Sequence, residues 1–111
     1  MARINYVELP VADTARAKAF YGSAFGWSFA DFGPSYAATT SGETDLGFQA
    51  DPADKTAAAL PVVDVADIDA ALTAVEAAGG TITAPLFDYP GGKRFHFRDP
   101  DGHELAVSQS H

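Results

Sequence analysis

Alternating and helical patterns of hydrophobic residues predict a strand and then a helix at the start of the chain. Residues 4–9 are strand-like, and the run ends at Pro10, which cannot donate to a strand ladder. Asp13 is a good N-cap, and Gly26 supplies a left-handed helix stop. Between them apolar residues recur at helical spacing: Ala17, Phe20, Tyr21 and Ala24. Phe20 lies at the centre of this stripe, so we expect it to be buried.

Short strands and a polar linker are predicted to follow the first helix. Strand-like segments cover residues 27–32, 36–40 and 45–49, and Gly-Pro and Ser-Gly pairs mark the turns between them. Residues 50–56 (ADPADKT) are polar, contain a proline and show no hydrophobic period. We therefore interpret residues 50–56 as a linker.

The second half of the chain repeats the order of the first. A strand is predicted over residues 58–63, and Asp67 is the candidate cap of the next helix. The stripe of that helix is Ile68, Leu72 and Val75, and Gly79-Gly80 ends it. The remaining predicted segments are strands 81–84, 93–98 and 104–108 and a long loop, Pro85 to Gly92.

The repeat predicts the fold class. It indicates an α+β protein with two tandem βαβββ units, because two independent segments agree on one order of elements. We expect a single domain over residues 1–111, with unit one at 1–49, the linker at 50–56 and unit two at 57–111. One unit leaves the face of a small sheet open, and pairing two such faces would bury both. A ligand is expected in the concave cavity between them.

Composition and charge narrow the classes of partner. The 111 residues are 47% hydrophobic, which is enough for a core. The net charge of −8 argues against nucleic acid and anionic membranes, since both require a basic face. The absence of cysteine excludes disulfides and thiolate metal sites. The chain shows no signal-peptide pattern and no membrane-length apolar run, so we expect a cytoplasmic protein.

Local motifs at both ends of the repeat resemble those of one superfamily. Residues 6–13 (YVELPVAD), 19–21 (AFY) and 25–27 (FGW) are similar to the opening strand and helix of the vicinal-oxygen-chelate superfamily. Residues 91–105 (GGKRFHFRDPDGHEL) resemble its closing hairpin, with a type I turn at Asp-Pro-Asp-Gly. This superfamily contains glyoxalases, bleomycin-resistance proteins and extradiol dioxygenases. The chain looks closest to its small, mostly uncharacterised bacterial glyoxalase-like proteins.

The resemblance also implies where a metal would bind, and this chain departs from the pattern. The family's ligands, usually His, Glu or Gln, lie on the first and last strands of each unit. Those positions fall here on Tyr6, Gly47, Ala58 and Ala106. Glycine and alanine have no donor atoms, and tyrosine is an uncommon ligand for the divalent ions concerned. We therefore expect no metal and no cofactor. Only shifts of two residues would restore a site, by bringing in Glu8, Asp45 and Glu104.

Two residues are candidate catalytic groups. Glu8 lies two residues after Tyr6, so both side chains point to the same face of the first strand. In a partly apolar pocket Glu8 could serve as a general base, whereas at the sheet rim it would only face water. His96 alternates with Phe95 and Phe97, which places it on the face away from the phenylalanines. It could move protons near neutral pH, or it could be a structural histidine.

Other residues are candidate ligand-binding groups. Arg94 lies on the same strand face as His96 and would suit an anionic ligand, and Glu104 shares a face with Ala106. In the 85–92 loop, Phe87 and Tyr89 could form a lid. The predicted ligand-binding set is Tyr6, Glu8, Arg94, His96, Glu104, Phe87 and Tyr89. Further aromatic residues that could wall a pocket are Trp27, Phe32, Tyr36 and Phe48, although such residues more often form plain core.

Three functions remain open at this point. The leading hypothesis is a glyoxalase- or bleomycin-resistance-like homodimer that binds a small organic molecule between paired units without metal. The alternative is a metal-dependent lyase, isomerase or dioxygenase that uses Glu8 and Glu104, with or without His96. A third hypothesis is a fold that serves only as an interaction module. No phosphate-binding glycine loop, dinucleotide fingerprint or Gly-x-Ser-x-Gly elbow is present.

Overall fold

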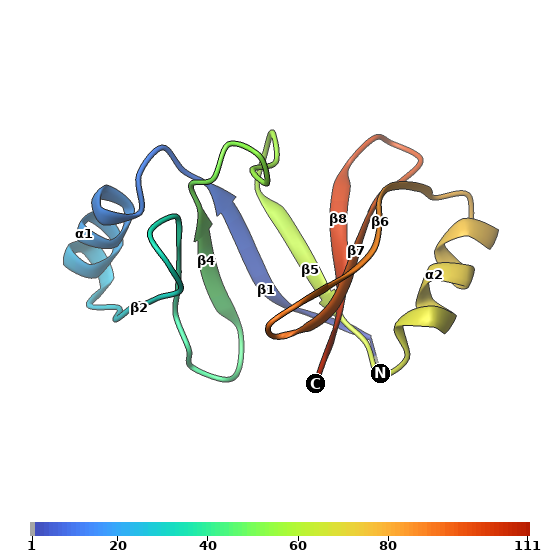
Figure 1. Ribbon diagram of the computed structural model, residues 1–111, viewed down its shortest axis with the longest axis horizontal. Coiled ribbons are helices and arrows are strands. Elements are labelled where there is room, and N and C mark those ends of the chain that lie inside the picture. Colours follow the sequence, from blue (N-terminus) through green and yellow to red (C-terminus); the bar gives the residue numbers. More distant parts are fainter. Residues whose placement is uncertain (1) are drawn as a thin grey trace. The chain divides into compact units, whose positions relative to one another are not determined.

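The fold consists of two compact units, each with a small sheet and one helix. The computed structural model describes residues 2–111. The N-terminal unit comprises Tyr6–Leu60, and the C-terminal unit comprises residues 2–5 together with 61–111 (Figure 1). The predicted order of strand, helix and three strands occurs twice. The α+β fold class with two βαβββ repeats is therefore confirmed.

In the N-terminal unit, one helix follows the first strand of a mixed four-stranded sheet. The elements of this unit are β1 (Arg3–Pro10), which enters it at Tyr6, α1 (Thr14–Phe25), β2 (Ala30–Asp31), β3 (Tyr36–Ala38) and β4 (Asp45–Gln49). The strand order is β2-β3-β4-β1, and β1 pairs with β4 in parallel. β4 therefore lies between β1 and β3, which places side chains from both neighbours beside it.

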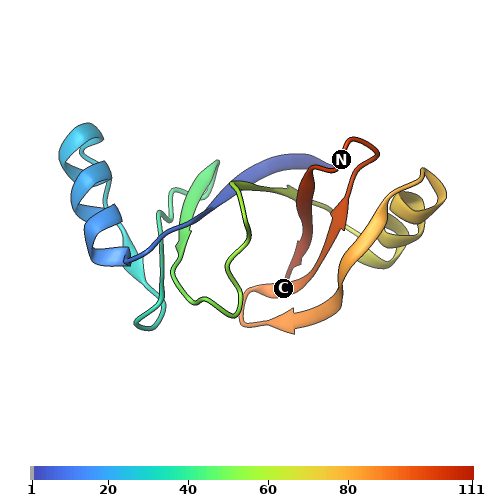
Figure 2. The same ribbon diagram turned by 90° about the horizontal axis from the view of Figure 1, so that it is seen from above.

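The C-terminal unit repeats this arrangement, with longer strands after the helix. Its elements are β5 (Leu60–Asp64), α2 (Ile68–Ala77), β6 (Thr81–Tyr89), β7 (Gly92–Arg98) and β8 (Glu104–Ser110). The order is β5-β8-β7-β6, with β5 parallel to β8 and the others antiparallel. The helix α2 lies beside this sheet in both views (Figure 1, Figure 2). No helix within residues 2–111 has the length and apolar character needed to cross a bilayer.

Both predicted helix caps are present. The Asp13 carboxylate accepts a hydrogen bond from the Arg16 amide at 3.1 Å, and the Asp67 carboxylate accepts one from the Ala70 amide at the same distance. Each carboxylate satisfies one amide that the first helical turn leaves without a partner. Gly26 ends α1 with φ of 73°, a left-handed conformation that glycine adopts without strain.

The two helices differ in how much they bury. Ile68 of α2 packs with Phe95 and Val107 in a core cluster, and each of the three is at most 2% exposed. α1 contains no buried residue, and Phe20 is 63% exposed. The expectation that Phe20 is buried is therefore wrong. Tyr21 holds α1 to its sheet instead, with its ring 5.5 Å from that of the fully buried Phe48.

Two sequence-based segments also need correction. The predicted strand 27–32 is shortened to Ala30–Asp31. The residues before it pack as aromatic side chains instead: the ring centres of Trp27 and Tyr21 are 6.0 Å apart, and those of Phe29 and Phe48 are 5.1 Å apart. The predicted loop 85–92 is mostly strand, since β6 continues to Tyr89 and pairs with β7. Register shifts on either side of Ala84 let the strand absorb Pro85, which cannot donate to the ladder.

Candidate functional site

The first candidate cluster lies on the N-terminal sheet and joins two tyrosines to a buried glutamate. We call Tyr6, Glu8 and Tyr36 the tyrosine–glutamate cluster. The hydroxyls of Tyr6 and Tyr36 are 2.5 Å apart, and the Tyr36 hydroxyl donates to Glu8 Oε1 at 2.9 Å. Glu8 is only 3% exposed. A carboxylate this deeply buried requires hydrogen bonds of this kind.

The hydrogen bonds of this cluster are donated in one direction, from Tyr6 to Tyr36 and from Tyr36 to Glu8. The Tyr36 proton points to Glu8, so the proton between the two phenols belongs to Tyr6. Burial, followed by the negative charge of Glu8 and the proximity of Tyr6, raises the pKa of Tyr36 far above its ordinary range. Tyr36 therefore remains a neutral donor to Glu8 at any physiological pH.

Gly47 makes room for the two phenols. It is buried in the middle of β4, opposite Glu8 on β1 and Ala38 on β3. A Cβ atom at this position would overlap the Tyr6 hydroxyl and lie 2.5 Å from the Tyr36 hydroxyl. The next residue, Phe48, points to the opposite face, where it meets Tyr21 of α1. The tyrosine–glutamate cluster thus occupies the sheet face that α1 does not cover.

The second candidate cluster lies on the C-terminal sheet. We call Thr83, Arg94, His96 and Glu104 the histidine–glutamate cluster. His96 Nδ1 lies 3.1 Å from Glu104 Oε2, and the Thr83 hydroxyl donates to the same oxygen at 3.0 Å. Arg94 Nε donates to His96 Nε2 at 3.1 Å. These contacts assign the neutral tautomer, because Nε2 accepts and Nδ1–H must donate to the carboxylate.

Strand alternation and hairpin register bring this cluster together. Phe95 belongs to the core with α2, so Arg94 and His96 point to the other face of β7, as the alternation predicts. Arg98 is paired with Glu104 across the β7–β8 hairpin, which places Glu104 diagonally from His96. Such a diagonal neighbour is within reach of a long side chain.

The two aromatic residues predicted to form a lid lie at different places in this hairpin. The Phe87 ring lies 6.1 Å from the His96 ring, beside the histidine–glutamate cluster. Tyr89 is paired with Gly92 at the hairpin turn, and its ring folds over Gly91. Tyr89 is therefore placed away from His96, and the segment predicted to be a lid is a paired strand.

One polar residue in each cluster has a role that the sequence does not predict. Tyr36, expected at most to wall a pocket, links Tyr6 to Glu8 through its hydroxyl. Thr83, which stands in no sequence motif, donates to the Glu104 carboxylate. Trp27 and Phe48 lie in the aromatic packing around Tyr21, not beside either cluster. Both missed roles depend on strand register, for which the sequence contains no local signal.

The residues present do not fit the metal that the fold family implies. Gly47 has no side chain, and the Tyr6 and Tyr36 hydroxyls fill the space where one would start. Ala106 is buried opposite His96 and offers no donor atom. Asp45 belongs to the alternative ligand set that a shift of two residues would bring in, but its carboxylate is hydrogen-bonded within the β3–β4 turn. Within residues 2–111, no three His, Asp or Glu side chains come together as a metal-binding group.

Asp45 shows its structural role in its hydrogen bonds. Its carboxylate accepts from the Thr39 hydroxyl and the Ser41 amide, both at 2.7 Å, and from the Gly42 amide at 3.1 Å. Partial burial by itself would raise the pKa of Asp45, but these hydrogen bonds outweigh it and lower that pKa. Asp45 therefore closes a turn.

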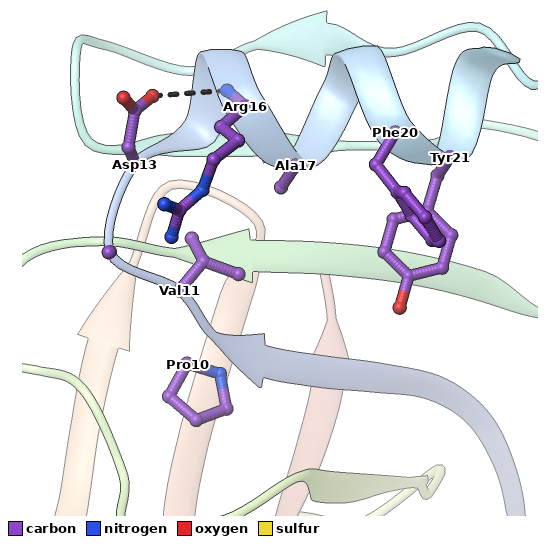
Figure 3. A pocket seen from close by; sticks show the side chains of 8 residues that line it. Pro10, Val11, Asp13, Arg16, Ala17, Phe20 and Tyr21 are labelled. Carbon is purple, nitrogen blue, oxygen red and sulfur yellow. Dashed lines mark hydrogen bonds between the residues drawn. The ribbon is translucent and has the colours of Figure 1, made fainter.

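A separate pocket lies on the α1 side of the N-terminal unit (Figure 3). It has a volume of about 390 Å³ between the end of β1 and the first turns of α1. Pro10, Val11 and Ala17 form apolar walls, and the Arg16 guanidinium points toward Val11 (Figure 3). The pocket contains none of the predicted site residues.

Comparison with known proteins identifies the family. The model of the glyoxalase/bleomycin resistance protein/dioxygenase superfamily matches residues 3–107. The chain belongs to this superfamily. The resemblance found in the opening strand and the closing hairpin is thereby confirmed, and both candidate clusters lie within the matched residues.

Relatives within the superfamily share the sequence or the fold to different degrees. The proteins named "Putative glyoxylase CFP32" of Mycobacterium bovis and Mycobacterium tuberculosis are 32% identical over 117 residues. The match covers 96% of this chain and 45% of theirs, so the chain spans about half the length of these curated relatives.

Two solved structures show the fold alone, because their identity to this chain is low. A superfamily member from Vibrio splendidus is 18% identical, with a TM-score of 0.72 and complete coverage of both chains. The Mn(II)-bound glyoxalase from Novosphingobium aromaticivorans is 22% identical, with a TM-score of 0.70 over 98% of this chain and 40% of that one.

Proposed function

We propose that this superfamily member binds a small organic molecule without a metal ion. The groups that would contact the ligand are the tyrosine–glutamate cluster and the histidine–glutamate cluster. The observation that carries the proposal is the replacement of a donor side chain at Gly47 by two phenols that hold a buried carboxylate. The expectation of a cavity between the two units stays a prediction.

The placement of polar groups supports binding over a purely structural role. In both units one sheet face carries the large apolar side chains, Phe48 in one and Phe95 in the other. The other face carries Glu8 and His96, which are 3% and 8% exposed. Burying such groups costs free energy even when they are hydrogen-bonded. Their concentration on the faces away from the helices therefore favours a ligand-binding surface.

A second candidate function is proton transfer on a bound small molecule. The contact that favours it is the pair of His96 Nδ1 and Glu104 Oε2, which orients the imidazole. Relatives of this chain bear the name glyoxylase, which agrees with an enzymatic use of the fold. The metal-dependent alternative finds no support in the donor set described above.

Native mass spectrometry of freshly purified protein tests the proposal. We expect a co-purified small molecule, with occupancy lowered by Glu8→Gln and by His96→Ala. His103→Ala is the matched control, because His103 is an exposed histidine outside both clusters. Equal occupancy in all four proteins, or no ligand in any of them after a library screen, would contradict binding at these clusters.

A second arm of the experiment tests independence from metal. Dialysis against a chelator should leave the melting temperature unchanged, and zinc, nickel or manganese should not raise it. A metal at a hundredfold excess over its dissociation constant would add about 2.7 kcal/mol of stability. A shift that saturates at one equivalent and disappears in Glu8→Ala and Glu104→Ala would instead favour the metal-dependent alternative.

We also propose that the protein is a cytoplasmic homodimer. Phe20, Phe25 and Trp27 are 63%, 61% and 45% exposed, and exposed apolar patches often mark association surfaces. Sizing at micromolar concentration should give about twice the monomer mass. A monomer at all concentrations would contradict the dimer and leave the ligand-binding proposal intact.

A further inference from the structure

We infer that the pocket between the end of β1 and the first turns of α1 is a second binding site, for a small carboxylate with an apolar body. All of its lining residues belong to the N-terminal unit, and none belongs to the tyrosine–glutamate cluster. The site is therefore independent of the proposed ligand-binding clusters. Of the exposed aromatic residues proposed for self-association, Phe20 alone lines the pocket.

The pocket has the size and the walls of a small-molecule site. Its volume of about 390 Å³ lies toward the lower end of the range of roughly 300–1,000 Å³ that is usual for ligand pockets. Pro10, Val11 and Ala17 supply apolar walls, and the rings of Phe20 and Tyr21 extend them along α1 (Figure 3). Walls of this kind favour the apolar part of a ligand, because its contact with them removes apolar surface from water.

The helix presents its own apolar stripe to this pocket. Arg16, Ala17, Phe20 and Tyr21 share one face of α1, since residues three or four positions apart are neighbours on a helix surface. α1 has no buried residue, and Phe20 is 63% exposed. The stripe that the sequence predicts to be core is thus left open along the pocket, where a ligand would cover it.

Two of the three basic side chains of the N-terminal unit lie at one residue of the pocket, Val11. The Arg16 guanidinium points toward Val11 (Figure 3) and forms no ion pair within residues 2–111. Lys55 Nζ donates to the Val11 carbonyl oxygen at 3.2 Å. The third, Lys18, is paired with Asp31 at 2.7 Å. In a chain of net charge −8, positive charge is therefore concentrated at this end of the pocket.

An arginine beside apolar walls favours a carboxylate ligand. A guanidinium can donate two parallel hydrogen bonds to a carboxylate, and an ammonium group adds a compact positive charge. Asp13 also lines the pocket and would repel an anion beside it, but its Oδ1 accepts from the Arg16 amide at the start of the helix. The carboxylate of the ligand is therefore placed on the Val11 side, with its apolar body against Ala17 and Phe20.

A nuclear magnetic resonance titration with benzoate tests the site, and benzamide is the matched probe of the same shape without the charge. Benzoate should cause saturable shifts of the ¹⁵N-labelled amides of residues 11–21. Benzamide should bind about tenfold more weakly, since it offers no charge-assisted hydrogen bond to Arg16. The absence of saturable shifts, shifts confined to other residues, or equal affinity for the two probes would overturn the inference.

Two variants with the same change of charge test the place of the carboxylate. Arg16→Gln should weaken benzoate binding about tenfold, because it removes the charged donor. Lys18→Gln removes one positive charge from the same helix, but Lys18 does not line the pocket and is paired with Asp31. It should change the affinity by less than about twofold, since solvent and salt screen a charge outside the site. Equal weakening by both variants would overturn the inference.

Ala17→Leu tests the cavity without changing any charge. Leucine is also a good helix former, so the variant should stay folded, and its larger side chain should fill the pocket and abolish benzoate binding. Unchanged affinity would overturn the inference. Glu8→Gln should leave benzoate binding unchanged, because Glu8 does not line this pocket. If native mass spectrometry finds a ligand that depends on Glu8 while benzoate does not bind, the proposed function stands and this second site fails.

Discussion

The two units have the same order of elements but use them differently. In the C-terminal unit, α2 buries Ile68 against Phe95 and Val107. In the N-terminal unit, α1 also has an apolar stripe but buries none of its residues completely, and Phe20 and Phe25 are mostly exposed. Helical periodicity therefore shows which face is apolar without showing whether anything covers it.

The polar faces of the units also differ. On the N-terminal sheet Tyr36 donates to the Glu8 carboxylate and its hydroxyl also contacts that of Tyr6. On the C-terminal sheet a hydroxyl and a histidine contact the Glu104 carboxylate, and Arg94 donates to the histidine. The first arrangement depends on close packing of two phenols over Gly47. The second depends on charge and on the tautomer of one imidazole. The two clusters should consequently respond differently to mutation and to pH.

The largest expected effect on stability distinguishes the core of the C-terminal unit from the exposed side chains of α1. Phe95→Ala should lower the free energy of unfolding by about 3–5 kcal/mol, because it removes a fully buried ring. Phe20→Ala should cost less than about 1 kcal/mol, since the ring is mostly exposed. Urea unfolding of both variants measures the difference. A large loss for Phe20→Ala would show that α1 is covered in solution, as the proposed homodimer would allow.

The next largest expected effect is a loss of stability at alkaline pH, which arises in the N-terminal unit. The raised pKa of Tyr36 contributes stability that is complete below its unfolded value, about 10, and is lost as pH rises further. Above that value the wild type should lose up to about 1.4 kcal/mol per pH unit more than Tyr36→Phe does. Urea unfolding at several alkaline pH values measures this, and parallel curves would refute it.

A smaller effect should be the same in both units. Asp13→Ala and Asp67→Ala each remove one N-cap hydrogen bond and should each cost about 1 kcal/mol. Thermal unfolding of the two variants side by side measures the costs. If only the Asp67 variant is destabilised, then α1 frays independently of its sheet and the contrast between the helices is greater than the structure indicates.

The smallest expected effect is a loss of stability at acid pH. Hydrogen bonds from Thr39, Ser41 and Gly42 lower the pKa of Asp45, so its contribution to stability is present above the unfolded value of about 3.9 and declines as pH falls below it. Asp45→Asn should flatten this part of the stability curve. Urea unfolding across the acid range measures this, and equal slopes for Asp45→Asn and the wild type would contradict the assignment to Asp45.

Much of the fold follows from local patterns that one sequence displays. The caps at Asp13 and Asp67 and the stop at Gly26 were predicted because capping depends on a few adjacent residues. The alternation of Phe95 with His96 correctly separated the two faces of β7, since side-chain direction in a strand has a period of two. The paired strand over residues 85–89 was missed, because Pro85 is a strong local signal against a strand and only bulges accommodate it.

The sequence by itself determined the repeat, the family and the types of residue available for chemistry. The tertiary structure decided which of those residues meet. Tyr6 and Tyr36 are 30 positions apart and join only because β4, with Gly47 facing them, lies between their strands. His96 finds Glu104 only through the register of one hairpin. Strand order and register arise from packing of the whole unit, and a shift of one residue would turn every such side chain to the opposite face.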